Sequence, residues 1–391
     1  MELTVATNWD DRLLDNFNEI NKEHGGIKEV FGSLRSSVVG NARSSSTLPD
    51  VNSGKAKKHI ELAHKYGFSF NYTFNGTCTS GMEYQADFHN RVLDYLDQVV
   101  DLGIDSFVVT IPYYLEIIKN RYPDIPVKVS VMAHVDTLNK MKVWESLGAD
   151  RIVVCDSLNR DFPMLKRMLD ESKVQLEILA GNCCLHHCPF QYYHQNLVSH
   201  MSQVDNPLKG MYVEYPVMRC TLEKFTKPEE IIRGRWLRPE DIKDYEDLGF
   251  TQFKVGARQS SVEWNTRTVK AYASRHYDGN LINILQGFEP ITDIDNKKME
   301  GVDQKHWDMF KQGLDAYKGF QDFLYLDNRK LDGFLDHYKN NSCRYNCYKC
   351  NYCNTVADKA IRVQEKEKLA ILIETVKFVL GGLSISEIMF E

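Results

Sequence analysis

Short β-rich runs alternate with amphipathic helical segments along most of this 391-residue chain, and this alternation narrows the possible folds more than any other feature. Leu-Gly pairs at 102–103, 147–148 and 248–249 each precede an apolar run, which indicates a helix that ends on glycine before a buried strand begins. Helices are predicted over residues 54–67, 84–103, 137–148 and 161–172. The predicted strands are 28–34, 69–75, 106–111, 127–133, 150–155, 174–180, one run within 211–222, and 252–257.

Strands that alternate with helices at this spacing indicate βαβ units and a parallel sheet. Eight such strands fit a closed α/β barrel of the (β/α)8 TIM type. A doubly wound open sheet is the alternative, but residues 33–47 are polar and irregular where its Gly-rich loop is expected. We therefore predict an N-terminal segment at 1–26, the barrel at 27–320, and a Cys-rich, mainly helical C-terminal extension at 321–391, with helices over 321–342 and 355–380.

Net charge and the apolar segments bear on where the protein works. A net charge of −6 argues against a surface built broadly for nucleic acid. The first residues lack a basic region followed by an apolar core, so no signal peptide is expected. The apolar run 369–383 is interrupted by Glu374, Lys377 and glycines, and is too short to span a bilayer. These features predict a cytoplasmic protein with no membrane segment.

Reactive and polar side chains follow several of the predicted strands. In a (β/α)8 barrel the loops after the strands carry the chemistry, so these residues are expected to share one rim. They are Asn75, Cys78, His134, Cys155, Asp156, Cys183 to Cys188, and Arg258.

The cysteines are better explained as metal ligands than as disulfides, because the chain has ten of them and no secretory signal. Cys183, Cys184 and Cys188 follow a Gly-Asn turn, and Cys220 lies further along, past another helix. Adjacent cysteines rarely bind one cluster, so Cys184, Cys188 and Cys220 are the first three candidates, with Cys183 or Cys78 as the fourth. Buried apolar thiols are the alternative. The flanking His186, His187 and His194 fit residues that orient ligands or lie on the surface better than ligands themselves.

The extension holds four more cysteines, Cys343, Cys347, Cys350 and Cys353. Structural zinc usually takes ligands as two separated pairs, whereas one compact run of thiols is more typical of an iron–sulfur cube. Zinc remains the alternative. The spacing of the first three also matches the triplet of radical S-adenosylmethionine enzymes, but here it follows the whole barrel, and Cys353 would fill the iron position that must stay open.

A basic surplus runs from Arg219 to Arg238. It has two explanations, a solvated loop or a pocket for an anionic substrate or a phosphate backbone. No nucleophile elbow, zincin motif or P-loop is present, and no nucleophilic pair stands out, so a hydrolase has no visible machinery. The surplus comprises Arg219, Lys224, Lys227, Arg233, Arg235 and Arg238.

Two stretches resemble the collagenase-like peptidase family, the thirty-second family of unknown catalytic type. One is the cysteine-rich strand end 177-EILAGNCCLHHCPFQYYH-194, and the other is the block 236-WLRPEDIKDYEDLGFTQFKVGAR-258. The resemblance covers roughly residues 27–275. The second block matches the family's pattern at Trp236, Arg238, Pro239, Glu240, Asp241, Tyr245, Glu246, Gly249, Phe253, Lys254 and Arg258.

The resemblance implies a barrel with a 4Fe-4S cluster at its rim, and in several branches of the family hydroxylation without dioxygen. Carried over by position, Cys184, Cys188 and Cys220 would hold the cluster, with Cys183 or Cys78 as the open fourth choice. The extension cysteines would hold a second cluster that feeds electrons to the first. The candidate catalytic residues are Lys254, Arg258 and His187, and the candidate substrate-binding residues are Arg233, Arg235, Arg238 and Asn75.

We therefore predict an iron–sulfur oxidoreductase that oxidatively modifies a small molecule, a peptide or RNA. The expected partners are this substrate, an electron-transfer protein and a related barrel chain. A collagenase-like protease is the first alternative, and a zinc-stabilised module that binds RNA or protein is the second.

Overall fold

A closed parallel barrel forms the body of the protein. The computed structural model describes all residues except 212–214, 290–303, 341, 344–345, 348 and 385–391. Neighbouring strands pair in chain order and β1 closes the ring against β8, with Leu3 opposite Phe253. This confirms the predicted (β/α)8 fold. The strands are β1 Glu2–Ala6, β2 Ile27–Gly32, β3 Ser69–Thr73, β4 Ser106–Val109, β5 Val127–Val129, β6 Arg151–Val153, β7 Gln175–Leu179 and β8 Gln252–Val255.

Two predictions about the barrel's strands were wrong. The segment 1–26 is not separate from the barrel, because it contains strand β1 and the helix that follows it. The strand expected within 211–222 is instead the start of helix α8, Tyr215–Thr226, and its residues 212–214 lie outside the described part of the chain. The two errors are connected: β1, with the sequence ELTVA, is short and contains Glu2 and Thr4, and without it the prediction placed an eighth strand elsewhere.

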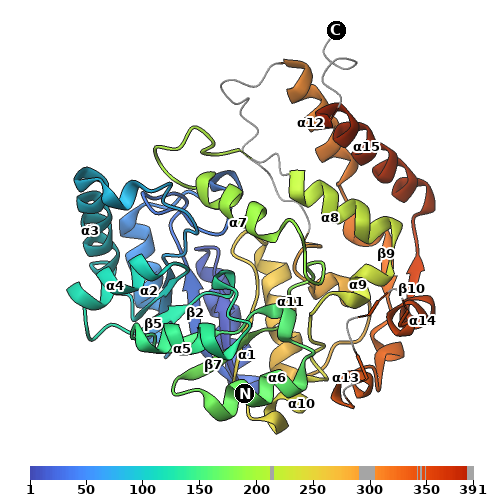
Figure 1. Cartoon of the computed structure of the whole chain (residues 1–391), viewed down its shortest axis with the longest axis horizontal. Helices are drawn as coiled ribbons and strands as arrows, with labels where there is room; N and C mark the ends of the chain where they lie inside the picture. The colour runs from blue at the N-terminus through green and yellow to red at the C-terminus, as the bar shows by residue number, and fades with distance from the viewer. Residues whose placement is uncertain (212–214, 290–303, 341, 344–345, 348, 385–391) are drawn as a thin grey trace.

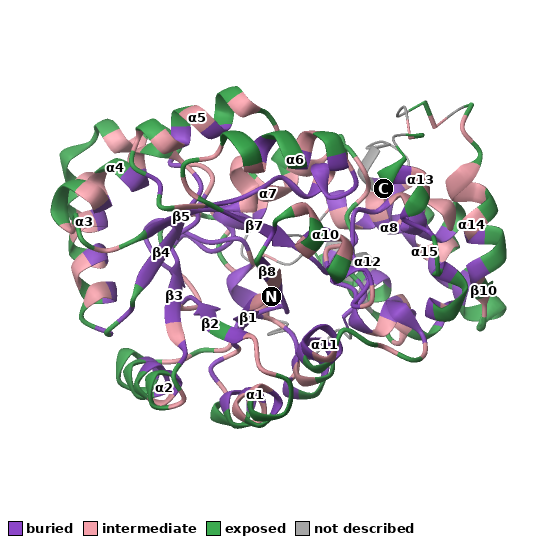
Figure 2. Cartoon of the chain, turned by 90° about the horizontal axis from the view of Figure 1, so that it is seen from below, coloured by how far each residue is buried: buried purple, intermediate pink, exposed green. Residues whose placement is uncertain are grey.

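Helices cover the outside of the barrel, and Figure 2 shows α1, α2 and α11 around the strands. Side chains of Asn52, Thr137 and Asp161 accept a backbone N–H at the starts of α2, α5 and α6. The glycines of the three Leu-Gly pairs all have positive φ, from 88° to 126°, as predicted. The outer helices are α1 Asp11–His24, α2 Ser53–Lys65, α3 Ala86–Val100, α4 Pro112–Arg121, α5 Leu138–Ser146, α6 Phe162–Glu171, α10 Ile242–Leu248 and α11 Val262–Ser274.

The connection between β7 and β8 is much longer than a single helix. It contains α7 Gln191–His200, α8 and α9 Glu229–Arg233 before α10. Figure 1 shows α7 and α8 beside the barrel, between it and the C-terminal extension. Within the described residues, no helix is both long and apolar enough to cross a membrane.

The extension is less helical than predicted. Residues 321–342 contain the strand β9 Leu324–Leu326 and the short helix α13 Asp336–Lys339 in place of one helix. The helix expected over 355–380 is divided into α14 Tyr352–Ala360 and α15 Lys366–Ser384 by the strand β10 Ile361–Val363, which pairs antiparallel with β9. Local periodicity did not reveal this break, because β10 depends on its partner in the other segment. Helix α12 Gln304–Ala316 packs on α15.

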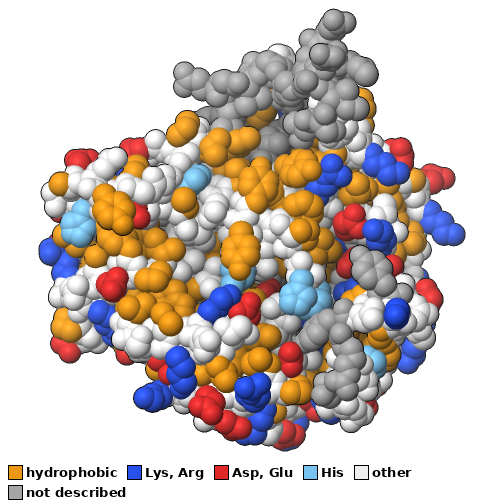
Figure 3. All heavy atoms as spheres, in the orientation of Figure 1, with side chains coloured by type: hydrophobic (Ala, Val, Ile, Leu, Met, Phe, Trp, Pro, Cys, Tyr) orange, Lys and Arg blue, Asp and Glu red, His pale blue; other side chains and the backbone are white. Residues whose placement is uncertain are grey.

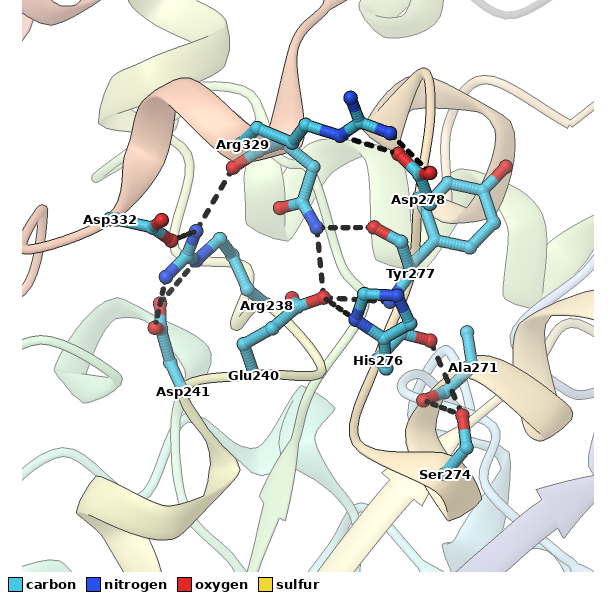
Figure 4. A network of polar contacts seen from close by, with 11 residues as sticks. Arg238, Glu240, Asp241, Ala271, Ser274, His276, Tyr277, Asp278, Arg329 and Asp332 are labelled. Atoms are coloured by element: carbon cyan, nitrogen blue, oxygen red, sulfur yellow. Dashed lines mark hydrogen bonds and ion pairs between the residues drawn. The ribbon is translucent and has the colours of Figure 1, made fainter.

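The extension docks on the long β7–β8 connection, with α14 against α9 and α15 against α8. A buried polar joint strengthens this contact (Figure 4). Arg238 donates two hydrogen bonds to Asp241, at 2.7 and 3.0 Å, and reaches Asp332 and the carbonyl of Asn328, each at 3.0 Å. Because a buried guanidinium needs such partners, the joint holds the extension in one place on the barrel.

Candidate active site at the carboxyl end of the barrel

Because all eight strands run parallel, their carboxyl ends meet at one rim. Asn75 follows β3, His134 follows β5, Cys155 follows β6 and Arg258 follows β8. The predicted strand-end residues therefore come from separate strands that end on the same side of the barrel. In Figure 3 hydrophobic side chains gather on the face that carries α7 and α8. Tyr192 and Tyr193 on α7 are 63% and 52% exposed there.

Four cysteines gather where the β7 loop approaches α8, and we call them the barrel cysteine group. Cys183, Cys184 and Cys188 lie on the loop after β7, and Cys220 comes from α8. The charge of Cys220 influences the pKa of each of the other three thiols, so all four lie within electrostatic reach of one another. Gly234 allows this approach, since a Cβ there would lie only 3.3 Å from the sulfur of Cys183.

The thiols of the group are not acidic by themselves. Burial raises the pKa of Cys183 to about 11 and that of Cys184 to about 12. Burial also raises the pKa of Cys188. Part of the Cys184 residue is nevertheless exposed to solvent. Without a cation these thiols stay protonated at neutral pH. A bound metal would deprotonate them.

A buried cation stands beside the group. Lys224 is 5% exposed, and within the described residues no carboxylate forms an ion pair with it. Burial alone would lower its pKa, but Cys220, Cys183, Cys184 and the buried carboxylate of Glu289 raise it above the usual value. Thiolates that hold a metal would add negative charge beside this ammonium, whereas neutral thiols would not. The environment therefore fits an anionic metal–thiolate centre.

The geometry also limits which centre fits. Among the described residues, no three His, Cys, Asp or Glu side chains converge closely enough to hold one metal ion. An iron–sulfur cube takes its thiolates at separate irons, around a body rather than a point, and thiolates are the ligands it uses. The donor set thus suits a cluster better than a single zinc ion. Cys78 lies beside Ser80, whose backbone N–H donates to its sulfur at 3.4 Å.

Arg258 forms a second feature of the rim. Its guanidinium is buried among hydroxyl and amide oxygens: it donates to Ser33, to Thr73 at 3.0 Å and to Asn41 at 3.4 Å. Burial and the nearby Arg43 both lower the pKa of Arg258. A guanidinium stays charged at neutral pH all the same, so this pocket carries a positive charge that an anionic substrate group would neutralise.

Below this pocket, buried charges line the barrel interior. Lys128 contacts Glu29 at 2.5 Å and Glu177 at 2.6 Å, and Arg151 lies within 3.6 Å of both carboxylates. These four charges balance. Lys254 is a fifth ionisable group beside them. Burial is the largest cause that lowers its pKa, to about 7, and the repulsion of Lys128 is the next. Its ammonium lies 3.9 Å from the centre of the Phe31 ring, a contact that favours the charged form. A pKa of about 7 would suit a group that exchanges a proton near neutral pH.

The structure brings together one pair that the sequence did not indicate. The sulfur of Cys155 lies 3.8 Å from Nδ1 of His134, whose Nε2 is 2.7 Å from Gln195. His134 adopts a left-handed conformation with φ of 49°, which turns its ring toward the rim. Burial and Asp156 raise the pKa of Cys155 to about 11, which opposes formation of a thiolate.

The arginines of the basic segment that were predicted to bind the substrate each contact other residues of the chain. Arg238 belongs to the barrel–extension joint, where it contacts Asp241 and Asp332, and its assignment to substrate binding stays a prediction. Arg233 donates to Glu230 and, at 3.0 Å, to Asn354 of α14, and therefore faces the extension. Arg235 contacts His186 through two nitrogen pairs at 2.7 and 2.8 Å.

The histidines of the β7 loop are kept neutral. Burial, then Arg235, lowers the pKa of His186 to about 2 and also lowers that of His187, so neither ring carries charge at neutral pH. Asn75 is 5% exposed, and its amide lies 3.7 Å from the sulfur of Met132. These contacts leave the predicted roles of His187 and Asn75 as predictions.

A family model covers most of the chain, and two named relatives and one solved structure are similar to it. Residues 25–304, more than half of the chain, match peptidase family U32. A protein of Methanocaldococcus jannaschii described as an uncharacterized protease is 29% identical over 326 residues, which cover 83% of this chain and 86% of that one. The tRNA hydroxylation protein P of Escherichia coli is 19% identical over 89 residues, 22% of this chain and 20% of that protein. The solved structure of a U32 peptidase is 25% identical, with a TM-score of 0.49, over 66% of this chain and 93% of that one.

Proposed function

We propose, from the premise that the chain belongs to peptidase family U32, that it is an iron–sulfur oxidoreductase. In this proposal it oxidatively modifies, by hydroxylation without dioxygen, a substrate with an anionic group. The substrate is a small molecule, a peptide or RNA. Similarity to the tRNA hydroxylation protein P of Escherichia coli supports hydroxylation as the reaction. An electron-transfer protein would be the redox partner, and a second, related barrel chain could complete the assembly.

One observation carries the proposal: Cys220, from α8, lies within electrostatic reach of the thiols of the β7 loop, with buried Lys224 beside them. Buried thiols beside a buried ammonium, whose one nearby carboxylate among the groups that raise its pKa is Glu289, become more favourable when the thiols are thiolates. Cys183, Cys184, Cys188 and Cys220 would hold an iron–sulfur cluster, which supplies one-electron oxidation and reduction when bound.

The chain's own residues would bind the substrate and handle protons. Arg258 would hold the anionic group of the substrate by charge-assisted hydrogen bonds, in place of some of its contacts with Thr73 and Asn41. Lys254, with a pKa of about 7, would accept or donate a proton deeper in the barrel. Burial and the repulsion of Lys128 would keep that pKa low, against the opposite effect of Glu177 and Glu29.

Iron analysis of matched cysteine variants tests the proposal. The protein is purified without oxygen, and iron, acid-labile sulfide and zinc are measured per chain together with the visible absorption spectrum. Cys220→Ala should lower the iron and sulfide content. Cys155→Ala, which also removes a rim thiol but lies outside the barrel cysteine group, should not. Equal iron in both variants, or zinc in place of iron, would contradict the cluster.

A protease is the second candidate, and the Cys155–His134 contact is the observation that favours it. Peptide hydrolysis by a thiol requires a thiolate, and the raised pKa of Cys155 works against one. The discriminating measurement is cleavage of unfolded collagen and casein by the iron-loaded protein. Cleavage that disappears in Cys155→Ala but persists in Cys220→Ala would favour the protease over the oxidoreductase.

A further inference from the structure

The extension cysteines lie next to the segment that leads back to the barrel. Cys343, Cys347, Cys350 and Cys353 are all half-buried, and Cys343 and Cys353 pack against the buried hydrophobic core. Arg233 stands beside them, because it donates at 3.0 Å to the side chain of Asn354, the residue after Cys353. Like the barrel cysteine group with Lys224, this second group has a cation that can offset thiolate charge.

A short series of contacts joins the two groups. The hydroxyl of Tyr338 is 3.3 Å from the sulfur of Cys353. The guanidinium carbon of Arg235 lies 5.6 Å from the centre of the Tyr338 ring. Arg235 also donates from Nε to Nδ1 of His186 at 2.8 Å, and His186 stands two residues from both Cys184 and Cys188. Three non-covalent contacts therefore lead from an extension cysteine to the loop of the barrel cysteine group.

Aromatic packing holds this path in place. Trp236 stacks on Phe334 with ring centres 5.9 Å apart, and Phe334 packs on Tyr338 at 5.4 Å. The guanidinium of Arg160, from the loop after β6, lies 4.7 Å from the Trp236 ring and 4.6 Å from the Phe334 ring. Cation–π and stacked contacts of this kind stabilise a dry and rigid contact between the barrel and the extension.

We propose that the extension cysteines hold a second iron–sulfur cluster, and that Tyr338, Arg235 and His186 join it electronically to the barrel cysteine group. The inference rests on the proposed function for the barrel site. When the substrate is oxidised, the barrel site, which lies around the buried Cys183, takes up its electrons and passes them one at a time to the half-exposed extension site. The extension site then reduces a soluble one-electron acceptor protein, and no bond or proton changes partner in this transfer.

The spacing and the contacts favour a cluster over zinc in the extension. The four cysteines span eleven residues, with no second, separated pair to close a tetrahedron. No three ligands among the described residues converge on one ion there. A hydroxyl that donates to a thiolate sulfur is also one of the protein's means of tuning a cluster potential, and Tyr338 is placed to do so.

Metal content and electron paramagnetic resonance of the full chain, purified without oxygen, test the two sites separately. The wild type should hold about eight irons, two cubes of four, and no zinc. Cys347→Ala/Cys350→Ala and Cys184→Ala/Cys188→Ala should each keep about half of that iron. After reduction by dithionite the wild-type signals should be broadened by interaction between the two clusters, and each double variant should give one unbroadened signal.

A milder substitution covers the case in which a double variant does not fold. Tyr338→Phe keeps the ring and its packing but removes the hydrogen bond to Cys353. It should leave the iron content unchanged and shift one midpoint potential to a more negative value, because the lost O–H···S bond favours the reduced, more negative cluster. Tyr325→Phe is the matched control, since the Tyr325 ring packs on Arg362 at 4.0 Å rather than on a cysteine.

The outcomes separate this inference from the proposed function. Zinc in the extension, or iron that is unaffected by Cys347→Ala/Cys350→Ala, would overturn the second cluster and leave the barrel cluster standing. Iron that is unaffected by Cys184→Ala/Cys188→Ala would overturn the proposed function and the connection together. Two clusters without mutual broadening, or equal potentials in Tyr338→Phe and the wild type, would overturn the connection alone.

Discussion

Replacing Lys254 by methionine should remove a pH-dependent weakness from the barrel core. Two carboxylates, Glu29 and Glu177, face two cations, Lys128 and Arg151, at 2.5 to 3.6 Å, so the interior is balanced without a fifth charge. A protonated Lys254 adds one further positive charge in a half-buried position close to Lys128, and burial followed by this repulsion lowers its pKa to about 7. Methionine fills a similar volume without that charge.

The size of the effect follows from the pKa. Because one pKa unit corresponds to about 1.4 kcal/mol, the fall from 10.5 to about 7 makes protonated Lys254 cost the folded state on the order of 5 kcal/mol. The unfolded chain binds this proton more tightly, so the cost is absent above pH 10.5, grows as the pH falls and is complete below about pH 7. From pH 9 to pH 7 the wild type should therefore lose about 2 kcal/mol more free energy of unfolding than Lys254→Met.

Urea unfolding of both proteins at pH 9, 8 and 7, followed by circular dichroism, measures this difference. Groups other than Lys254 titrate alike in the two proteins and cancel. Lys243→Met is the control, because Lys243 is an exposed partner of Asp247, and its difference from the wild type should not change with pH. A difference between Lys254→Met and the wild type that stays constant from pH 9 to pH 7 would refute a depressed pKa for Lys254.

Three further substitutions test the rim and the joint. Arg258→Leu should weaken binding of the anionic substrate about 10- to 100-fold, the range for a charged hydrogen bond; a KM equal to the wild type's would show that the pocket binds no anion. Phe334→Ala should destabilise the docked extension by about 3–5 kcal/mol through loss of a buried aromatic ring. Limited proteolysis should then cleave the extension before the barrel, and unchanged cleavage would contradict the role of the aromatic contacts. Arg238→Ala should cost about 3–5 kcal/mol of unfolding free energy, because it leaves the 8% exposed Asp241 without its partner; a loss below about 1 kcal/mol would show that the joint is not a buried ion pair.

The barrel itself could be predicted from the sequence because its signals are local. The turn from Leu102-Gly103 into β4 and the turn from Leu147-Gly148 into β6 each combine a helix end, a glycine of positive φ and an apolar run within a few residues. The alternation of such units leaves few topologies other than parallel strands with outer helices. The first strand escaped this reasoning, because β1 has no preceding helix or turn to mark it.

The partners of individual side chains were harder to predict than the elements that carry them. Arg233, Arg235 and Arg238 are alike in the sequence, but one faces Asn354, one His186 and one Asp332. The Cys155–His134 contact joins residues that follow different strands. The spacing gave no clue to these partners, because Arg233, Arg235 and Arg238 follow no single period and Arg233 ends helix α9.

The sequence by itself determined the period of the barrel, the helix ends at the Leu-Gly pairs, and the kinds of ligand that the chain offers at its cysteine-rich segments. These properties depend on residues within one or two turns of each other. Only the tertiary structure decided that β1 closes the barrel against β8, and that Tyr338 and Arg235 lie between the two cysteine groups. Such contacts join residues far apart in the chain, and packing selects them after the local elements have formed.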